Sequence, residues 1–112
     1  MAQKINDINY SLIRIKDLKV FGHHGVFQEE TDFGQNFYVC VDAYQNIAPA
    51  ASMDELMLTT NYADMCDHIV RFLTENTFKL IETAAEELSN SLLLKYPLIR
   101  ALWLRSKSPR LP

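Results

Sequence analysis

The chain has 112 residues, 48% of them apolar, and a formal net charge of −3, as expected for one folded domain and not for a disordered segment. Its 11 lysines and arginines form no cluster, so no nucleic-acid partner is indicated. The sequence contains neither a membrane-spanning run of about 18 apolar residues nor the apolar stretch of a signal peptide at its start. We therefore expect a cytoplasmic protein without a membrane partner, in which Cys40 and Cys66 are reduced core residues rather than a disulfide.

The first predicted strand, Leu12 to Phe21, follows a polar segment, 1–9, that we interpret as a loose arm ahead of a single domain over 10–112. Its apolar residues change phase, because Ile13 and Ile15 occupy odd positions whereas Leu18 and Val20 occupy even ones. A bulge near Asp17 would place both pairs on the same face.

The second predicted strand lies beyond a polar loop that runs from the Gly22–Gly25 break to Gly34. From Phe37 to Tyr44 apolar residues alternate with Tyr38, Cys40 and Asp42, which is the period of a strand. Since the two strands are close in sequence, we expect them to pair antiparallel.

Two helices and a third strand complete the predicted fold. After a loop over 46–59, Thr60 or Asn61 can cap a helix whose apolar residues keep helical spacing up to about Asn76. The apolar stripe of a second helix runs from Ile81 to Leu92, with Pro97 beyond its end. Residues 99–105 alternate again. This order of strand, strand, helix, helix and strand predicts an α+β fold with both helices on one face of an antiparallel sheet.

The other face of this sheet is predicted to need a cover. Tyr38, Cys40 and Tyr44 are partly apolar for a solvent-exposed face, and the free sheet edges are exposed as well. A second copy of the chain is the simplest cover. A domain of this size can also hardly enclose a ligand pocket of ~300–1,000 Å3 alone, so we expect a homo-oligomer with a site between subunits.

Five short segments together resemble the sequence motifs of a known protein family. They are HGVFQEE at 24–30, GQ at 34–35, TNY at 60–62, LIE at 80–82 and KSPRLP at 107–112. None is specific alone, but in this order and spacing the chain from about Ile13 to Pro112 resembles the dihydroneopterin aldolases. The resemblance implies a pterin-binding T-fold, in which subunits join into a β-barrel ring of four, usually stacked as eight. The usual fourth strand after the K-x-P turn is absent from this sequence.

The reaction that the resemblance implies is a retro-aldol cleavage in folate biosynthesis. Dihydroneopterin would give 6-hydroxymethyl-dihydropterin and glycolaldehyde. The sequence leaves open whether C2′ epimerase activity accompanies this cleavage. The family uses neither a metal nor a Schiff base, and no cofactor is expected, because the ring imine of the pterin can accept the electrons of the broken carbon–carbon bond. The protein then supplies positioning and proton transfers.

The resemblance also implies the site residues. Glu82 matches the pterin anchor, since a carboxylate can accept hydrogen bonds from a ring N–H and an adjacent amino group. Lys107 matches the catalytic lysine that exchanges protons with the hydroxyl or ring nitrogen. From position alone, Glu82 would be an ordinary surface glutamate of a helix, and Lys107 a solvated lysine.

Other matched positions include Tyr62, which corresponds to a tyrosine that relays a proton, although its spacing also fits a core aromatic. Glu30, five positions before Gln35, matches the acid that contacts the side-chain hydroxyls of the substrate. Ile81 and Asn61 complete the implied substrate-binding set. We expect Glu82 and Lys107 from one subunit and Tyr62 from its neighbour.

Alternatives to this interpretation concern the histidines and the reaction. His23 and His24 are adjacent on a strand end, so they point to opposite sides and can hardly chelate one metal, and His68 has no paired ligand beside it; we expect no metal site. A dihydroneopterin triphosphate epimerase would need extra cations for phosphates, for which Arg105 and Arg110 are candidates. A non-catalytic oligomeric module on the same scaffold would not need the Glu82–Lys107 pair.

Overall fold

The structure, a computed structural model, describes residues 2–5, 8–46 and 60–107. Along the chain these form β1 (Ala2–Ile5), β2 (Ile8–Gly22), α1 (Gln28–Phe33), β3 (Gln35–Asn46), α3 (Tyr62–Glu75), α4 (Ile81–Lys95) and β4 (Ile99–Lys107). No helix in this described part is both long and apolar enough to cross a membrane.

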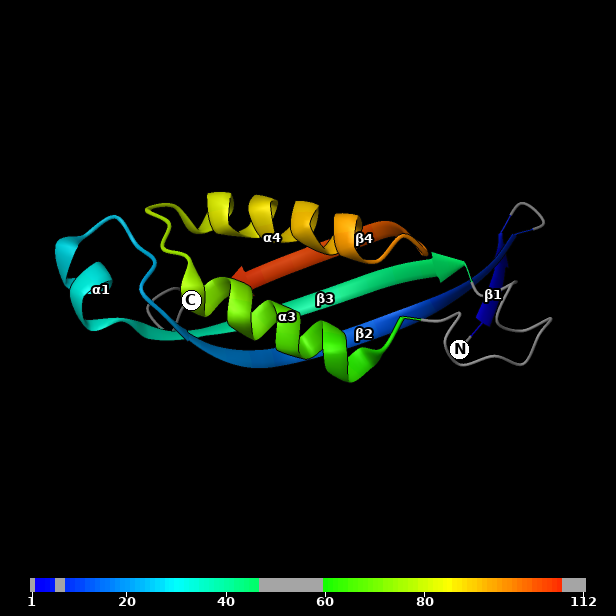
Figure 1. Cartoon of the computed structure of the whole chain (residues 1–112), viewed down its shortest axis with the longest axis horizontal. Helices are drawn as coiled ribbons and strands as arrows, with labels where there is room; N and C mark the ends of the chain where they lie inside the picture. Colours follow the sequence, from blue (N-terminus) through cyan, green and yellow to red (C-terminus); the bar gives the residue numbers. More distant parts are fainter. Residues whose placement is uncertain (1, 6–7, 47–59, 108–112) are drawn as a thin grey trace.

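The strands form one antiparallel sheet in the order β1-β2-β3-β4, and both long helices lie on the same face of it (Figure 1). Helix α3 packs over β2, and α4 packs over β4. The predicted α+β class and the two helices on one face are therefore confirmed. The opposite face, which carries Tyr38, Cys40, Tyr44 and Trp103, is called the helix-free face below.

The predicted bulge in the first strand is also confirmed. The pairing of β2 with β3 changes register between Ile15 and Leu18, and Asp17 has a left-handed backbone with φ of 52°. Ile15 and Val20 are both buried on the helix-covered face, with Ile13 and Leu18 packed against the same core. The bulge thus corrects the phase of the apolar residues so that both halves of β2 face the helices.

The core lies between the sheet and the two helices. Every second residue of β3, including Val39 and Val41, is buried on this side. Residues spaced by four along each helix meet them: Met65, Ile69 and Leu73 from α3, and Ala84, Leu88 and Leu92 from α4. This apolar burial is the main force that fixes where each helix lies.

Three expectations differ from the structure. Residues 2–5 form β1, which pairs with Ile8–Ser11, so this part of the predicted loose arm is a strand. The predicted polar loop before Gly34 contains α1. Cys40, predicted in the core, is a free thiol on the helix-free face, where its Sγ donates to Asp17 Oδ1 at 3.4 Å. Cys66 is also free and packs against the core.

Candidate active site

A cavity of about 400 Å3 lies at the end of the molecule where α1 and the start of α4 meet. Its wall comes from the loop after β2, from α1, from the start of β3 and from the residues that lead into α4. Three of the predicted site residues line it together, namely Glu30, Ile81 and Glu82. Gln35 of the GQ pair lies there too. The volume falls in the range of small-molecule pockets, ~300–1,000 Å3.

Glu82 occupies the first turn of α4, directly after the helix start at Leu80 and Ile81. Its side chain is exposed, and within the part of the chain that the structure describes its carboxylate has no hydrogen-bond or ion-pair partner. Backbone N–H groups at the start of a helix favour a negative charge beside them. Glu82 therefore presents a carboxylate at the cavity wall that a ligand can reach.

Glu30 is held differently, because its carboxylate already binds its own loop. Glu30 Oε1 accepts from the Phe27 backbone N–H at 3.2 Å, and Glu30 Oε2 accepts from Gln35 Nε2 at 3.0 Å. Gly25 allows this arrangement: its φ is 150°, and a Cβ there would lie 2.6 Å from Glu30 Cβ. Each carboxylate oxygen has more than one lone pair, so Glu30 can brace α1 and still accept a hydrogen bond from a ligand.

The two histidines of the break after β2 have separate partners, as their opposite directions predicted. His23 Nδ1 donates to the Thr31 carbonyl at 2.8 Å. His24 is buried, with Nε2 2.9 Å from the Leu73 carbonyl and Nδ1 3.1 Å from the Phe78 amide nitrogen. Burial lowers the pKa of His24. Among the described residues, no three His, Cys, Asp or Glu side chains are grouped as metal ligands.

Tyr62 and Asn61 do not line this cavity. Both lie at the start of α3, and Figure 1 places that start at the other end of the helix layer from α1. The Asn61 side chain caps α3 by accepting from the Asp64 N–H at 3.0 Å. Tyr62 is 53% exposed, and the neighbouring Cys66 side chain, followed by burial, raises the pKa of its phenol. Tyr62 thus keeps its proton at neutral pH and lies at the surface.

Lys107 is the last residue of β4, and its backbone pairs with Tyr38 of β3. Its side chain lies outside the described residues. So do residues 108–112, which include the rest of the K-x-P segment and Arg110. The strand thus runs two residues beyond the predicted 99–105 and ends at the Lys107 backbone, and the role of Lys107 remains a prediction.

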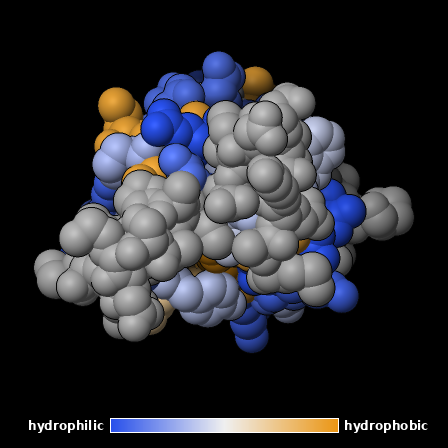
Figure 2. Space-filling view, turned by 90° about the vertical axis from the view of Figure 1, so that its right-hand side faces the viewer, coloured by the Kyte–Doolittle hydropathy of each residue, from blue (hydrophilic) through white to orange (hydrophobic). Residues whose placement is uncertain are grey.

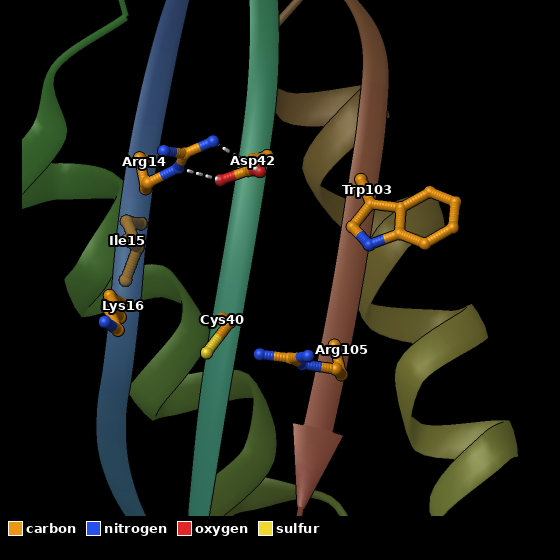
Figure 3. A pocket seen from close by; sticks show the side chains of 7 residues that line it. All are labelled: Arg14, Ile15, Lys16, Cys40, Asp42, Trp103 and Arg105. Atoms are coloured by element: carbon orange, nitrogen blue, oxygen red, sulfur yellow. Dashed lines mark hydrogen bonds and ion pairs between the residues drawn. The ribbon is translucent and has the colours of Figure 1, made fainter.

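A second cavity, of about 300 Å3, lies on the helix-free face. Figure 3 shows its wall, in which Arg14 forms an ion pair with Asp42 at 2.9 Å, while Trp103 and Arg105 come from β4. Arg105, considered above as a phosphate ligand, therefore lines a different cavity from Glu82. None of the implied pterin-binding residues that the structure describes lies here.

Residues to which the sequence assigned no role also line the first cavity, including Phe27, Lys79 and Leu80. Phe27 and Leu80 belong to the quoted motifs and Lys79 directly precedes LIE, so position in or beside a motif was the available signal. Val26 and Phe27 are 67% and 65% exposed, and Leu80 is also exposed. These exposed apolar side chains border the first cavity without closing it. At the opposite end of the molecule, the described surface seen in Figure 2 is mostly hydrophilic, with small hydrophobic patches.

The fold and this cavity define a small α+β domain with a ligand-sized site at one end of its helix layer. The sequence model of the family described as "FolB: Dihydroneopterin aldolase" matches residues 13–112. The dihydroneopterin aldolase of Methylorubrum extorquens is 34% identical over 100 residues, which cover 89% of this chain and 77% of that protein.

Solved structures share the fold. E. coli dihydroneopterin aldolase in complex with neopterin superposes with a TM-score of 0.79 at 23% identity, covering 88% of this chain and 85% of that one. A Burkholderia thailandensis dihydroneopterin aldolase bound to guanine gives 0.74 at 19% identity, with 92% and 81% covered. The chain belongs to the dihydroneopterin aldolase family.

Proposed function

We propose that the chain is a dihydroneopterin aldolase of folate biosynthesis, which cleaves 7,8-dihydroneopterin into 6-hydroxymethyl-7,8-dihydropterin and glycolaldehyde in the cytoplasm. The observation that carries the proposal is the cavity that joins Glu82, Ile81 and Glu30 in a chain of this family. Glu30 is distant in sequence from Ile81 and Glu82, and only the fold brings it to the same wall.

Pterin recognition is the role proposed for Glu82. A pterin presents a ring N–H beside an amino group, and guanine presents the same edge, which matches the two oxygens of one carboxylate. The ligands named for the two solved relatives, neopterin and guanine, have this edge in common. The lack of any described partner for Glu82 supports the assignment, because a carboxylate engaged in the fold would first have to be released.

The chemistry requires little more than orientation and proton transfer. Loss of the side-chain hydroxyl proton releases glycolaldehyde as the adjacent carbon–carbon bond breaks, and the electron pair moves into the ring imine, whose nitrogen takes up a proton. Protonation of this intermediate at the side-chain carbon, with loss of the proton from the ring nitrogen, restores the imine and gives the hydroxymethyl product. Lys107 is proposed to exchange these protons, and Tyr62 to protonate the intermediate or the leaving fragment. Glu30 and Asn61 are proposed to contact the substrate, and Ile81 to pack against the ring.

The complete site is proposed to span two subunits of a ring, four per ring and two rings stacked. Support comes from the distance between the start of α3 and the start of α4 in one subunit, seen in Figure 1, and from the exposed apolar rim at Val26, Phe27 and Leu80. Residues of β4 at the sheet edge are available for pairing with another copy. The neighbour would then bring Tyr62 to the cavity.

A triphosphate epimerase is the second candidate. Lys79 is the single cation in the described lining of the cavity, whereas a triphosphate carries about four negative charges near neutral pH and binds best to several cations. We therefore favour the unphosphorylated substrate. Turnover of dihydroneopterin against its triphosphate, at equal concentrations, distinguishes the two enzymes.

The experiment that tests the proposed function is glycolaldehyde release from dihydroneopterin by the wild type and by Glu82→Gln. The amide keeps the shape but replaces one acceptor with a donor, so neopterin affinity should fall by about 10–100-fold, as expected for a charge-assisted pair. Glu86→Gln, on the same helix and also exposed, is the control and should behave as wild type. The proposal would be contradicted if the wild type released no glycolaldehyde, or if Glu82→Gln and Glu86→Gln bound neopterin with equal affinity.

A further inference from the structure

His24 is a buried titratable side chain for which the proposed mechanism has no use. It is only 1% exposed, yet it lies on the wall of the cavity that contains Glu82. The Leu73 carbonyl can only accept a hydrogen bond and the Phe78 amide can only donate one, so these two partners determine the tautomer of the imidazole. The proton is on Nε2, Nδ1 is the acceptor, and the imidazole is neutral.

These bonds connect the loop after β2 to the end of α3 and to the segment that leads into α4, both about 50 residues further along the chain. Through Nε2, His24 caps a carbonyl in the last turn of α3, where no further helical N–H is available. Through Nδ1 it holds the backbone of Phe78, and the neighbouring Gly25 N–H donates to the Phe78 carbonyl at 3.0 Å. The ring also stacks on the Phe78 ring, with centroids 5.6 Å apart. Both polar groups of the Phe78 backbone are therefore bound by residues 24 and 25.

Gly22 makes room for this arrangement. A Cβ at position 22 would lie 2.8 Å from His24 Cδ2 and 2.9 Å from its Nε2. Any larger residue would therefore push the imidazole away from Leu73. The spacing Gly-x-His-Gly thus gives the ring a defined place, and the second glycine adds the hydrogen bond to Phe78.

Phe78 is only four residues before Glu82. The later turns of α4 are fixed by the buried Ala84, Leu88 and Leu92, but Leu80 at its start is exposed and Ile81 is only partly buried. Ile81 and Phe78 pack against the edge of the core, and the hydrogen bonds to the Phe78 backbone add the directional restraint that places the first turn, which carries Glu82. An anchor displaced by about 1 Å can lose much of its effect on a bound substrate.

We propose that His24 is a positioning residue, which sets the place of the Glu82 carboxylate by holding Phe78 through its Nδ1 atom. The inference rests on the proposed function only in taking Glu82 as the pterin anchor. It assigns His24 no contact with the reacting atoms. Binding of the pterin, rather than the chemical step, is the property that His24 controls.

Three substitutions separate the two hydrogen bonds. In His24→Asn the side-chain oxygen can take the place of Nδ1 and accept from Phe78, but the amide cannot reach Leu73. In His24→Gln the amide can reach Leu73 and the Phe78 bond is lost. His24→Phe loses both and keeps the stacking. His68→Phe is the matched control, because His68 also joins α3 to α4, through Ser91 Oγ at 2.7 Å, and is not among the cavity-lining residues.

The test measures the dissociation constant of neopterin, and KM and kcat for dihydroneopterin. We expect His24→Phe and His24→Gln to raise the dissociation constant and KM about tenfold with kcat changed less than about threefold, and His24→Asn to restore both to within about threefold of wild type. His68→Phe should leave them unchanged. Equal values for Asn and Gln, or a loss confined to kcat, would overturn the proposal.

Amide hydrogen exchange of the unliganded protein provides a second readout that needs no pterin. Exchange over residues 78–84 should be faster in His24→Phe and His24→Gln than in His24→Asn or His68→Phe. If His24→Phe does not fold, Gly22→Ala replaces it, since its Cβ displaces the ring. Unchanged exchange in all variants would refute the positioning role, whereas normal neopterin binding without glycolaldehyde release would refute only the proposed aldolase activity.

Discussion

Glu82 and Glu30 illustrate how two acids on one cavity wall can have different surroundings. Glu82 has an open carboxylate at a helix start, while Glu30 is bonded to Phe27 and Gln35. The sequence could predict both as site residues only through the resemblance, because a glutamate on a helix surface is otherwise unremarkable. It could not predict the brace around Glu30, which depends on α1 and on the backbone of Gly25.

Protonation of the buried His24 and the half-buried His68 should make the fold sensitive to acid. Burial lowers the pKa of His24 and of His68 in the folded chain, while in the unfolded chain both titrate near ~6.5. Below ~6.5 the unfolded chain therefore binds more protons, so the free energy of unfolding falls as the pH drops toward the folded values and then levels off.

Urea unfolding at about pH 7.5 and about pH 5.5, at one protein concentration, measures this effect. We expect lower stability at the acidic pH and a smaller difference in His24→Asn. Asp64, whose pKa is lowered first by the hydrogen bond from Tyr96, responds only near and below ~3.8 and does not interfere. Equal stability at both pH values would contradict the lowered pKa values of His24 and His68 in the folded chain.

At the level of elements, the sequence predicted β2, β3, α3, α4 and β4, because each has a clear apolar period. The bulge at Asp17 was predictable from the change of phase between Ile15 and Leu18. Two short elements were not. β1 has four residues and is stabilised by its pairing with β2. α1 has six residues, none of them buried, so no periodic pattern marks it.

The start of α3 permits a prediction for an element. Asn61 accepts from the Asp64 N–H and so satisfies one of the free amides of the first turn. Asn61→Ala should lower the free energy of unfolding by about 1 kcal/mol, within the range of ~0.5–2 for lost caps. Urea unfolding is the measurement, and Asn61→Asp, which keeps the acceptor, should remain near wild type. An alanine variant as stable as wild type would show that the cap contributes nothing.

For the molecule as a whole, a single chain brings the proposed anchor and the proposed tyrosine to different places. Glu82 lines the cavity, whereas Tyr62 lies at the far end of α3. The sequence pointed to a shared site through its small size and through the partly apolar helix-free face. Neither the sequence nor a single subunit defines the number of copies, because this depends on contacts between chains.

Mixed assemblies test the sharing of the site. At a dihydroneopterin concentration well below the wild-type KM, Glu82→Gln, with its weakened binding, and Tyr62→Phe should each be nearly inactive alone. If the two residues come from different subunits, unfolding and refolding the variants together in equal amounts should regenerate about one quarter of the wild-type sites. An intact site needs an unmutated Glu82 from one subunit and an unmutated Tyr62 from its neighbour, and each is supplied with a chance of about one half. Variants assembled separately and then mixed are the control. No recovery in co-refolded assemblies of normal mass would place both residues in one subunit.

The central claim is that the cavity at Glu82 is the pterin site. A crystal structure of the full chain with neopterin tests it most directly. We predict the pterin ring against Ile81, with its ring N–H and amino group within hydrogen-bond distance of the Glu82 carboxylate. A pterin bound instead on the helix-free face, between Arg14, Trp103 and Arg105, with Glu82 left in solvent, would contradict it.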